Sequence, residues 1–566
     1  MILKMKRFTF LTVLSVIILV GINSCGTKDD PKPEADGRTM KSIEVSGENK
    51  NFEAQITFSE GVYKNTDMTG NLDENSFNVT LTGGTGMSSY VVNHTSGQTN
   101  ATIYIELSDY SVGTETLNIS PKDGNSIFNA QAIAMASSEI QTAGIDGTVH
   151  ETINVKDDGS GTGIVRWTAN NTYILDGFVF VNDGQTLTIE EGTVIKGKAG
   201  QGENASALIV ARGGKIMAEG TAEHPIIFTA EADDLNGSVQ DLADGLWGGV
   251  IILGKAKTNT VPNEQQIEGI PQTEPRGVYG GDIDTDNSGV LRYISIRHGG
   301  TDIGEGNEIN GLTLGAVGSG TTIEYIEVFA NKDDGIEFFG GMPRLKNIIT
   351  AFCGDDSYDY DQGFRGYGQF WLAVQGYERG DRLGEHDGGT DPETGEPYAI
   401  PTIYNATYVG RGDGAAKRTI TFRDNAGGNY ANSIFYNQEK GIDVELLVDE
   451  CSYTRFDNGQ LTIKNNMFYS VGEPAIKVST GEGVAEADQI TADAVLAQYF
   501  NDANNEIADP GFNITGNTFN VIPSNEVSGN LTTVPDSWFT TVNYKGAIDP
   551  ANDWTAGWTL FSKYMN

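Results

Sequence analysis

Short runs in which apolar and polar residues alternate recur along most of the chain. Between residues 41 and 145 such runs are FEAQITF, SFNVTLT and ATIYIEL, and Gly, Asn and Asp lie between them. Alternation with a period of two residues predicts β-strands that bury one face and expose the other. Strands of this length and spacing predict a β-sandwich for residues 41–145.

From about residue 150 the strand pattern becomes a repeat. LTIEEGTVIKG at Leu187 aligns with LIVARGGKIMAEG at Leu208, and YIEVFANKDD at Tyr325 aligns with NIITAFCGDD at Asn347. A strand, a turn and another strand that recur at intervals of about 20–30 residues indicate a solenoid, in which each unit buries its apolar side only against its neighbours. The strands are β-branched and aromatic, so we expect an all-β chain with a right-handed parallel β-helix over residues 150–535.

Two further features complete this expected architecture. Asn recurs where strands begin, at Asn347, Asn405, Asn432 and Asn465, and Asn tolerates the left-handed backbone that a tight turn requires. The last stretch, residues 536–566, carries aromatic residues but no repeat. We expect it to cover the open C-terminal end of the solenoid, as terminal capping segments do.

Composition narrows the range of partners. The chain has 566 residues, 72 of them Gly, and its 77 acidic residues outnumber its 37 Lys and Arg by 40. An acidic chain of this kind repels polyanions, so nucleic acid is excluded as a partner. The acidic excess favours solubility and the capture of cations.

The N-terminus carries a targeting pattern. Lys4, Lys6 and Arg7 precede an apolar run over residues 8–20 and then the letters GINSC. The pattern resembles a bacterial lipoprotein signal over residues 1–24 with Cys25 as the lipidated residue, followed by a polar tether over residues 25–40. An ordinary cleaved signal and an anchor helix are the alternatives. The letters KDD behind the cysteine resemble the surface-export signal of Bacteroidota lipoproteins, which implies a lipid-anchored protein of the outer membrane, exposed at the cell surface.

The two expected domains each resemble a known group. ITFSEGVY and LNISPKDGNSIFNAQA, within residues 41–145, resemble bacterial Ig-like domains, which usually serve as spacers. The stretch from LIVARGGKIMAEG to NDWTAGWT resembles a group of Bacteroidota β-helix surface lipoproteins. This second resemblance implies an architecture and a location, and it implies no reaction.

One acidic pattern occurs twice. NKDDGIEFFGG at Asn331 and CGDDSYDYDQG at Cys353 align at an offset of 22 residues, which pairs Asp333 with Asp355, Asp334 with Asp356 and Glu337 with Asp359. Residues one rung apart in a β-helix lie about 4.8 Å apart. We therefore expect a ladder of carboxylates. The same alignment extends the ladder to Asp302 one unit earlier and to Asp413 one unit later.

Stacked carboxylates repel one another unless a cation lies between them. A hard cation such as Ca²⁺ is one solution, with Asp334, Asp356 and Asp359 as ligands. Neighbouring cations (Lys332, Arg365, Arg379 and Arg382) are another solution. The acids are otherwise a catalytic pair acting on a glycosidic bond, or caps of backbone N–H groups at turns.

Two further groups of residues are candidate binding sites. Tyr358, Tyr367 and Tyr377, with Arg365, suit a glycan because sugars stack on aromatic faces while polar groups hold their hydroxyls. Asp282, Asp284 and Asp286 resemble the start of a calcium loop. The sixth and twelfth positions of that loop are Asn287 and Tyr293, which do not match, and a polar turn is the alternative.

A catalytic role would use Asp333, Asp355, Asp356 and Asp359. NKDD followed by CGDD resembles the Asn-x-Asp and Asp-Asp pair of polygalacturonases, which maps onto Asn331, Asp333, Asp355 and Asp356. The Gly-His-Gly and Arg-x-Lys elements of that family are missing from the expected places. A lyase would instead use Ca²⁺ on the ladder with Arg365 or Arg382 as the base.

Three functions therefore remain open, in order of preference. The first is a non-catalytic surface lipoprotein that binds a glycan or another surface component, for example beside an outer-membrane importer, with Ca²⁺ stabilising the acidic ladder. The second is a polysaccharide lyase or glycoside hydrolase acting on acidic polysaccharide. The third is a structural subunit of an outer-membrane protein complex. No organic cofactor is expected.

Overall fold

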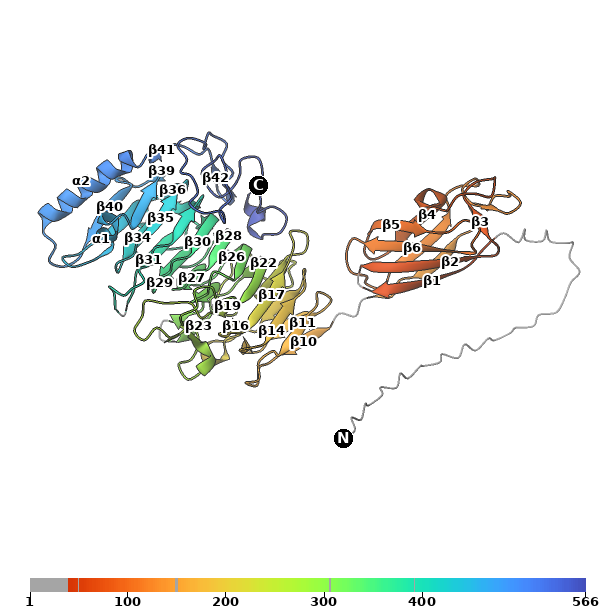
Figure 1. The fold of residues 1–566 in the computed structure, drawn as a ribbon, viewed down its shortest axis with the longest axis horizontal. Helices are drawn as coiled ribbons and strands as arrows, with labels where there is room; N and C mark the ends of the chain where they lie inside the picture. Colours follow the sequence, from red (N-terminus) through yellow and green to blue (C-terminus); the bar gives the residue numbers. More distant parts are fainter. Residues whose placement is uncertain (1–38, 49, 148–150, 305–306, 391, 566) are drawn as a thin grey trace, which may run out of the picture. The chain divides into compact units, whose positions relative to one another are not determined.

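The computed structural model describes residues 39–48, 50–147, 151–304, 307–390 and 392–565 (Figure 1). The chain divides into two compact units at residue 148. The expected signal segment, Cys25 and almost all of the tether lie outside the described residues. Within the described ranges, no helix has the length and apolar character needed to cross a membrane.

The first unit consists of two main antiparallel sheets around one core. One sheet has the strand order β1 (Met40–Glu48), β2 (Asn51–Phe58), β6 (Asn100–Leu107), β5 (Met87–Asn93), and the other has the order β4 (Phe77–Thr82), β7 (Thr116–Pro121), β9 (Gln141–Gly144). The short strands β3 (Val62–Tyr63) and β8 (Phe128–Asn129) form a further pair. Burial alternates strictly along β2, where Phe52, Ala54, Ile56 and Phe58 face the core. The structure therefore has the layers that the alternation predicts, and the Ig-like assignment stays a prediction.

The second unit is a parallel β-helix. All pairings within its two long sheets are parallel, as a right-handed β-helix requires. The ten-stranded sheet contains β13 (Phe178–Val181), β16 (Ala207–Val210), β19 (Val250–Leu253), β25 (Leu312–Gly315), β27 (Ile336–Phe339), β29 (Tyr358–Asp361), β31 (Gly384–Asp387), β34 (Arg418–Arg423), β37 (Lys440–Leu446) and β40 (Ile476–Thr480).

The eighteen-stranded sheet forms the remaining wall of the β-helix. Its strands are β10 (Thr152–Val155), β11 (Ile164–Trp167), β12 (Thr172–Leu175), β14 (Thr186–Ile189), β15 (Val194–Gly197), β17 (Lys215–Glu219), β18 (Ile226–Ala230), β22 (Gly289–Arg297), β26 (Thr322–Phe329), β28 (Arg344–Ala351), β30 (Tyr367–Val374), β32 (Thr402–Tyr404), β33 (Thr407–Gly412), β35 (Gly428–Ala431), β36 (Ile434–Gln438), β38 (Leu461–Lys464), β39 (Met467–Val471) and β41 (Glu506–Ile507). One continuous core joins the two sheets, because each rung buries its apolar side only against the next rung.

The recurrent asparagines occupy left-handed positions, as predicted. The φ angles of Asn347, Asn405, Asn432 and Asn465 lie between 55° and 58°. Three of these side chains also hold the C-terminal segment. Asn405 Nδ2 donates to the carbonyl of Tyr544 at 2.8 Å, Asn432 Nδ2 donates to the carbonyl of Thr532 at 2.9 Å, and Asn465 Nδ2 donates to the hydroxyl of Thr532.

The C-terminal segment therefore does not lie where we expected it. It follows the eighteen-stranded sheet back toward earlier rungs, where Trp558 packs on Tyr293 and Glu327 accepts the backbone N–H groups of Leu560 and Phe561. The last rungs are covered instead by the helix α2 (Glu486–Asp502), whose Leu496 is buried in the core of the β-helix. A second, short helix, α1 (Ser452–Asp457), precedes β38.

Candidate cation site

The register of the ten-stranded sheet confirms the predicted carboxylate ladder. Glu337 of β27 pairs with Asp359 of β29, which pairs with Glu385 of β31. Asp334 and Asp356 lie in the turns that precede β27 and β29, and the backbone N–H of Asp356 donates to Asp334 Oδ1 at 2.8 Å. The acids of the doubled pattern therefore lie on successive rungs, as an offset of 22 residues requires.

The predicted extension to Asp302 is wrong. Leu312 pairs with Ile336, so Asn310 is the residue that precedes Asp334 in its column. Asp302 belongs to the short strand β23 (Asp302–Gly304), which pairs with β24 (Asn307–Glu308) outside the β-helix sheets. The repeat is longer at this point because a hairpin is inserted, and an alignment of sequence letters alone cannot see that insertion.

Three carboxylates converge at the early rungs of the ladder. Oxygen atoms of Asp334, Glu337 and Asp359 lie within 4.8 Å of one another. Asp334 and Glu337 are each only 8% exposed. Burial raises the pKa of all three well above the usual range, and the neighbouring carboxylates raise each pKa further. Two buried acids and a third, half-buried one at this spacing need protons or a cation between them.

Two other side chains complete this group, which we call the early cluster. Glu268 lies beside Glu337, on the long loop that joins β19 to β22, and burial raises its pKa. Asn310 is 1% exposed and donates from Nδ2 to Glu337 Oε2. The other amide atom, Asn310 Oδ1, is buried without a hydrogen-bond partner, and so is Asp359 Oδ1. Unpartnered buried oxygens are costly unless an ion, a water molecule or a proton satisfies them.

The later rungs hold their acids differently, and we call them the late group. Arg382 contacts Glu385 at 2.9 Å and Asp356 at 3.4 Å. Arg423 contacts Glu385 at 2.6 Å, and its Nε and Nη2 contact the two oxygens of Asp387 at 2.6 and 2.9 Å. Asp356 is therefore ion-paired to Arg382, and its oxygens converge with those of Asp355 and Asp381.

The expected glycan platform does not form. Tyr358 is fully buried, and its hydroxyl lies 2.9 Å from the carbonyl oxygen of Leu372 and 3.2 Å from that of Ile348. Tyr367 belongs to the other sheet and is covered by Trp538 and Phe539 of the C-terminal segment. Tyr377 remains exposed, at 47%. Strand alternation explains Tyr358, since its neighbour Asp359 faces outward.

Two acids of the expected calcium loop, Asp284 and Asp286, have partners within the protein. Asp284 accepts the backbone N–H of Lys257 at 3.1 Å and contacts Arg365 at 3.3 Å. Asp286 accepts the backbone N–H of Lys255 at 3.0 Å. Among the described residues, no group of three converging ligands includes Asp282, Asp284 or Asp286. Asp284 and Asp286 hold a loop in place, and Arg365 is a partner of Asp284.

The catalytic arrangement is incomplete. Asp333 and Asp355 lie close to Asp334, and Asp355 is exposed. Asp356, by contrast, is 1% exposed and ion-paired. His386 is fully buried, stacked on Tyr360 at 3.9 Å with its Nε2 against the hydroxyl of Tyr430. Burial lowers the pKa of His386 to about 3. Of the four proposed catalytic acids, Asp355 is exposed, Asp333 and Asp359 are half-buried, and Asp356 is buried.

The fold and the site together define a parallel β-helix protein with a buried acidic cluster. The chain belongs to the family of pectate-lyase-like β-helix domains, whose family model matches residues 159–559. No curated protein matches the chain. Among solved structures, a Yersinia enterocolitica family 28 exopolygalacturonase is 11% identical over 79% of this chain and 88% of that chain, with a TM-score of 0.15. A TM-score of that size is too low to transfer a substrate or a residue role.

Proposed function

We propose that the protein is a non-catalytic binding protein whose β-helix takes up Ca²⁺ at the early cluster. The observation that carries this proposal is the convergence of Asp334, Glu337 and Asp359 within 4.8 Å, beside two buried oxygens that have no hydrogen-bond partner. The ligands would be these three carboxylates and Asn310 Oδ1. Glu268 would supply a further carboxylate from the loop between β19 and β22.

Ca²⁺ suits this donor set better than the common alternatives. All the donors are oxygens, which hard cations prefer, and no His or Cys belongs to the cluster. Ca²⁺ accepts six to eight oxygens in flexible geometry, whereas Mg²⁺ demands a near-octahedral shell and keeps several waters. A cation here would neutralise the repulsion between rungs and would tie the Glu268 loop to the sheet, so its effect would be on stability.

We infer the location and the class of ligand from the sequence alone. A lipid on Cys25 would anchor the protein to the outer membrane, and the KDD letters favour exposure at the cell surface. Extracellular calcium modules work at the high calcium concentrations found outside cells. The ligand that we propose is a glycan, or else a protein of the same surface, captured beside an outer-membrane importer.

Thermal unfolding with and without Ca²⁺ tests the cation. We expect Ca²⁺ at a hundred times its Kd to add about 2.7 kcal/mol to the free energy of unfolding. The pair Asp334→Asn and Asp359→Asn should abolish that gain. The exposed Glu482→Gln, in the same unit, is the matched control and should keep it. An unchanged melting temperature in wild type would contradict the proposal and would leave the early acids as protonated partners.

Action on an acidic polysaccharide is the second candidate function. It is favoured by the family, whose domain is described as pectate-lyase-like, and by Asp333, Asp334 and Asp355, which converge where Asp355 is exposed. Incubation with polygalacturonate in Ca²⁺, followed by assays for reducing and unsaturated ends, tests it. Product formation that Asp355→Asn abolishes while leaving the melting temperature unchanged would replace the binding role by catalysis.

A further inference from the structure

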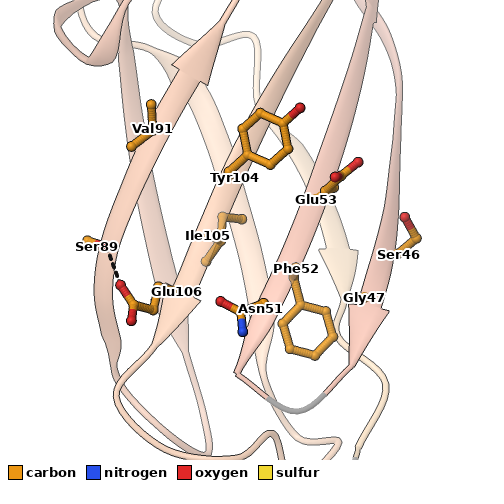
Figure 2. Close-up of a pocket in the computed structure, with 10 residues that line it drawn as sticks. All are labelled: Ser46, Gly47, Asn51, Phe52, Glu53, Ser89, Val91, Tyr104, Ile105 and Glu106. Carbon is orange, nitrogen blue, oxygen red and sulfur yellow. Dashed lines mark hydrogen bonds between the residues drawn. The ribbon is translucent and has the colours of Figure 1, made fainter.

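The first unit has a hollow on the outer face of the sheet β1-β2-β6-β5. Its volume is about 730 Å³, and its lining comes from all four strands (Figure 2). The residues that line it are Ser46, Gly47, Asn51, Phe52, Glu53, Ser89, Val91, Tyr104, Ile105 and Glu106. This unit was expected to be a spacer without chemistry.

Strand register brings the exposed lining side chains into two rows. Ser46 pairs with Glu53, Glu53 pairs with Tyr104, and Tyr104 pairs with Val91, so one row crosses all four strands. In the second row Asn51 pairs with Glu106, and Glu106 pairs with Ser89. Opposite residues in an antiparallel sheet have Cβ atoms about 4.5–5.5 Å apart. One Tyr ring therefore lies among two carboxylates, an amide and two hydroxyl groups.

The aromatic ring is exposed but rests on a rigid base. Tyr104 is 43% exposed and its neighbour Val91 is 57% exposed, on a face that is otherwise mostly polar. Beneath this face Phe52 and Ile105 are only 3% and 2% exposed, because strand alternation turns their side chains into the core. The backbone under Tyr104 is the central strand β6, paired on both sides. The site is thus largely formed before a ligand arrives, which lowers the entropic cost of binding.

The charges of the residues that line the hollow indicate which class of ligand it can bind. Glu53 and Glu106 are acidic, and none of the ten lining residues is Lys, Arg or His. An acidic polysaccharide would be repelled. Ser89 Oγ already donates to Glu106 Oε2 at 2.9 Å, so this carboxylate is oriented to accept further hydrogen bonds. Carboxylates accept hydrogen bonds and cannot donate them, and an uncharged ligand rich in hydroxyl groups satisfies them without a balancing cation.

We propose that this hollow binds a neutral oligosaccharide, with a sugar ring on Tyr104 and its hydroxyl groups on Glu53, Glu106 and Asn51. A ligand with an apolar face and polar edges suits a site that combines one aromatic ring with a few placed polar groups. The inference rests on the binding role proposed above, and it does not depend on the cation. It names the ligand class and moves the glycan site from the β-helix to the first unit.

Titration calorimetry on the chain from residue 26 onward tests this site. The probes are cellohexaose, maltohexaose, xylohexaose, mannohexaose, polygalacturonate and a hexa-arginine peptide, each measured in Ca²⁺ and in EDTA. The variants are Tyr104→Ala, Tyr104→Phe and Glu53→Gln. Tyr377→Ala is the matched control, because Tyr377 is a similarly exposed tyrosine in the other unit.

We expect at least one neutral hexaose to bind, equally in Ca²⁺ and in EDTA. Tyr104→Ala should weaken binding about tenfold or more, equal to about 1.4 kcal/mol, while Tyr104→Phe keeps the ring and most of the affinity. Glu53→Gln should weaken binding less, and Tyr377→Ala should leave it unchanged.

Several outcomes would overturn the assignment. These are no binding of any neutral probe, binding that Tyr104→Ala leaves intact, preference for polygalacturonate, or Tyr104-dependent capture of the hexa-arginine peptide alone. Loss of binding in EDTA would tie the glycan to the β-helix cation and would overturn it too. If Ca²⁺ fails to stabilise the protein but a hexaose still binds through Tyr104, the cation proposal falls and this one stands.

Discussion

The early cluster and the late group belong to one column of the same sheet, yet they balance their charges in different ways. Glu337, Asp359 and Glu385 pair in register across β27, β29 and β31. Glu385 has two arginine partners, at 2.6 and 2.9 Å. Across the described ranges, none of the ion pairs that the arginines form reaches Asp334, Glu337 or Asp359. The same carboxylate repeat is thus neutralised from within the protein at one end and is left without a paired cation at the other.

The difference comes from what surrounds the sheet. The arginines of the late group come from β34 and from the turn before β31, so the next rungs supply the positive charge. The early cluster is covered by the loop between β19 and β22, which adds the carboxylate of Glu268 instead of a cation. A cluster of buried acids with one more acid above it is costly by itself. This contrast is why we assign an external cation to the early rungs only.

The largest expected effects come from the same substitution made at both ends of the column. In EDTA at neutral pH, Glu385→Gln should lower the free energy of unfolding by about 2 kcal/mol, because Arg382 and Arg423 lose a partner. The cost of breaking a buried pair is about 3–5 kcal/mol, reduced here because the arginines are partly exposed. Glu337→Gln should raise the free energy of unfolding by about 1 kcal/mol, because it removes a buried carboxyl group that must either take up a proton or stay charged beside other carboxylates. Urea unfolding of the two variants measures both.

The two variants should also differ in how much stability they gain from added Ca²⁺. Glu337→Gln should lose part of the calcium-dependent gain, because it loses a charged ligand, while Glu385→Gln should keep that gain in full. If both variants lower stability in EDTA by the same amount, the early and late rungs are equivalent, and the contrast between them is mistaken.

The repeat itself was predictable from the sequence, and its physical cause is simple. Short β-branched strands at regular spacing cannot bury their apolar side except by stacking. That rule, with an offset of 22 residues, was enough to place Glu337 against Asp359. It also predicted the left-handed backbone of Asn347, because the residue type has to match the turn. The Ig-like character of the first unit and the lipid on Cys25 stay predictions.

The balance of charge within the ladder was not predictable in the same way. Glu268 is 69 residues before Glu337 and lies in a loop without repeat, so no spacing rule connects them. The partner of each arginine depends on loop geometry, which is why Arg365 was proposed for a glycan and instead contacts Asp284. Alternation could have identified Tyr358 as buried, since it adjoins the outward-facing Asp359. The hollow on the outer face of the first unit has no signature in the sequence, because its lining residues are brought together only by strand register.

A smaller effect should appear in the dependence of stability on pH. The pKa values of the early cluster are raised in the folded state, so their stabilising contribution is complete below about pH 4 and is lost as the pH rises through the folded values. Nearby, burial raises the pKa of Asp361 to about 6. Metal-free protein should therefore lose about 1.4 kcal/mol per pH unit for each such group that titrates. Ca²⁺ needs deprotonated ligands, so its stabilising effect should be absent below the ordinary carboxylate range, about pH 4, and should grow as the pH rises. Melting temperatures in Ca²⁺ and EDTA across this range measure the difference, and a calcium gain that does not vary with pH would rule out carboxylate ligands.

The smallest expected effect distinguishes the early cluster from the acids of the loop that the sequence had also suggested for calcium. Asp282 is exposed, whereas Asp284 and Asp286 accept the backbone N–H groups of Lys257 and Lys255. Asp282→Asn should change the free energy of unfolding by less than about 0.5 kcal/mol, as surface substitutions usually do, and should leave the calcium gain intact. Asp359→Asn, by contrast, should abolish that gain. The two variants together test whether the calcium site is formed by the acidic sequence pattern of the loop or by carboxylate oxygens that converge in space. A calcium gain lost in Asp282→Asn and kept in Asp359→Asn would reverse the assignment, since it would mean that an exposed loop closes around the ion while the buried acids only share protons.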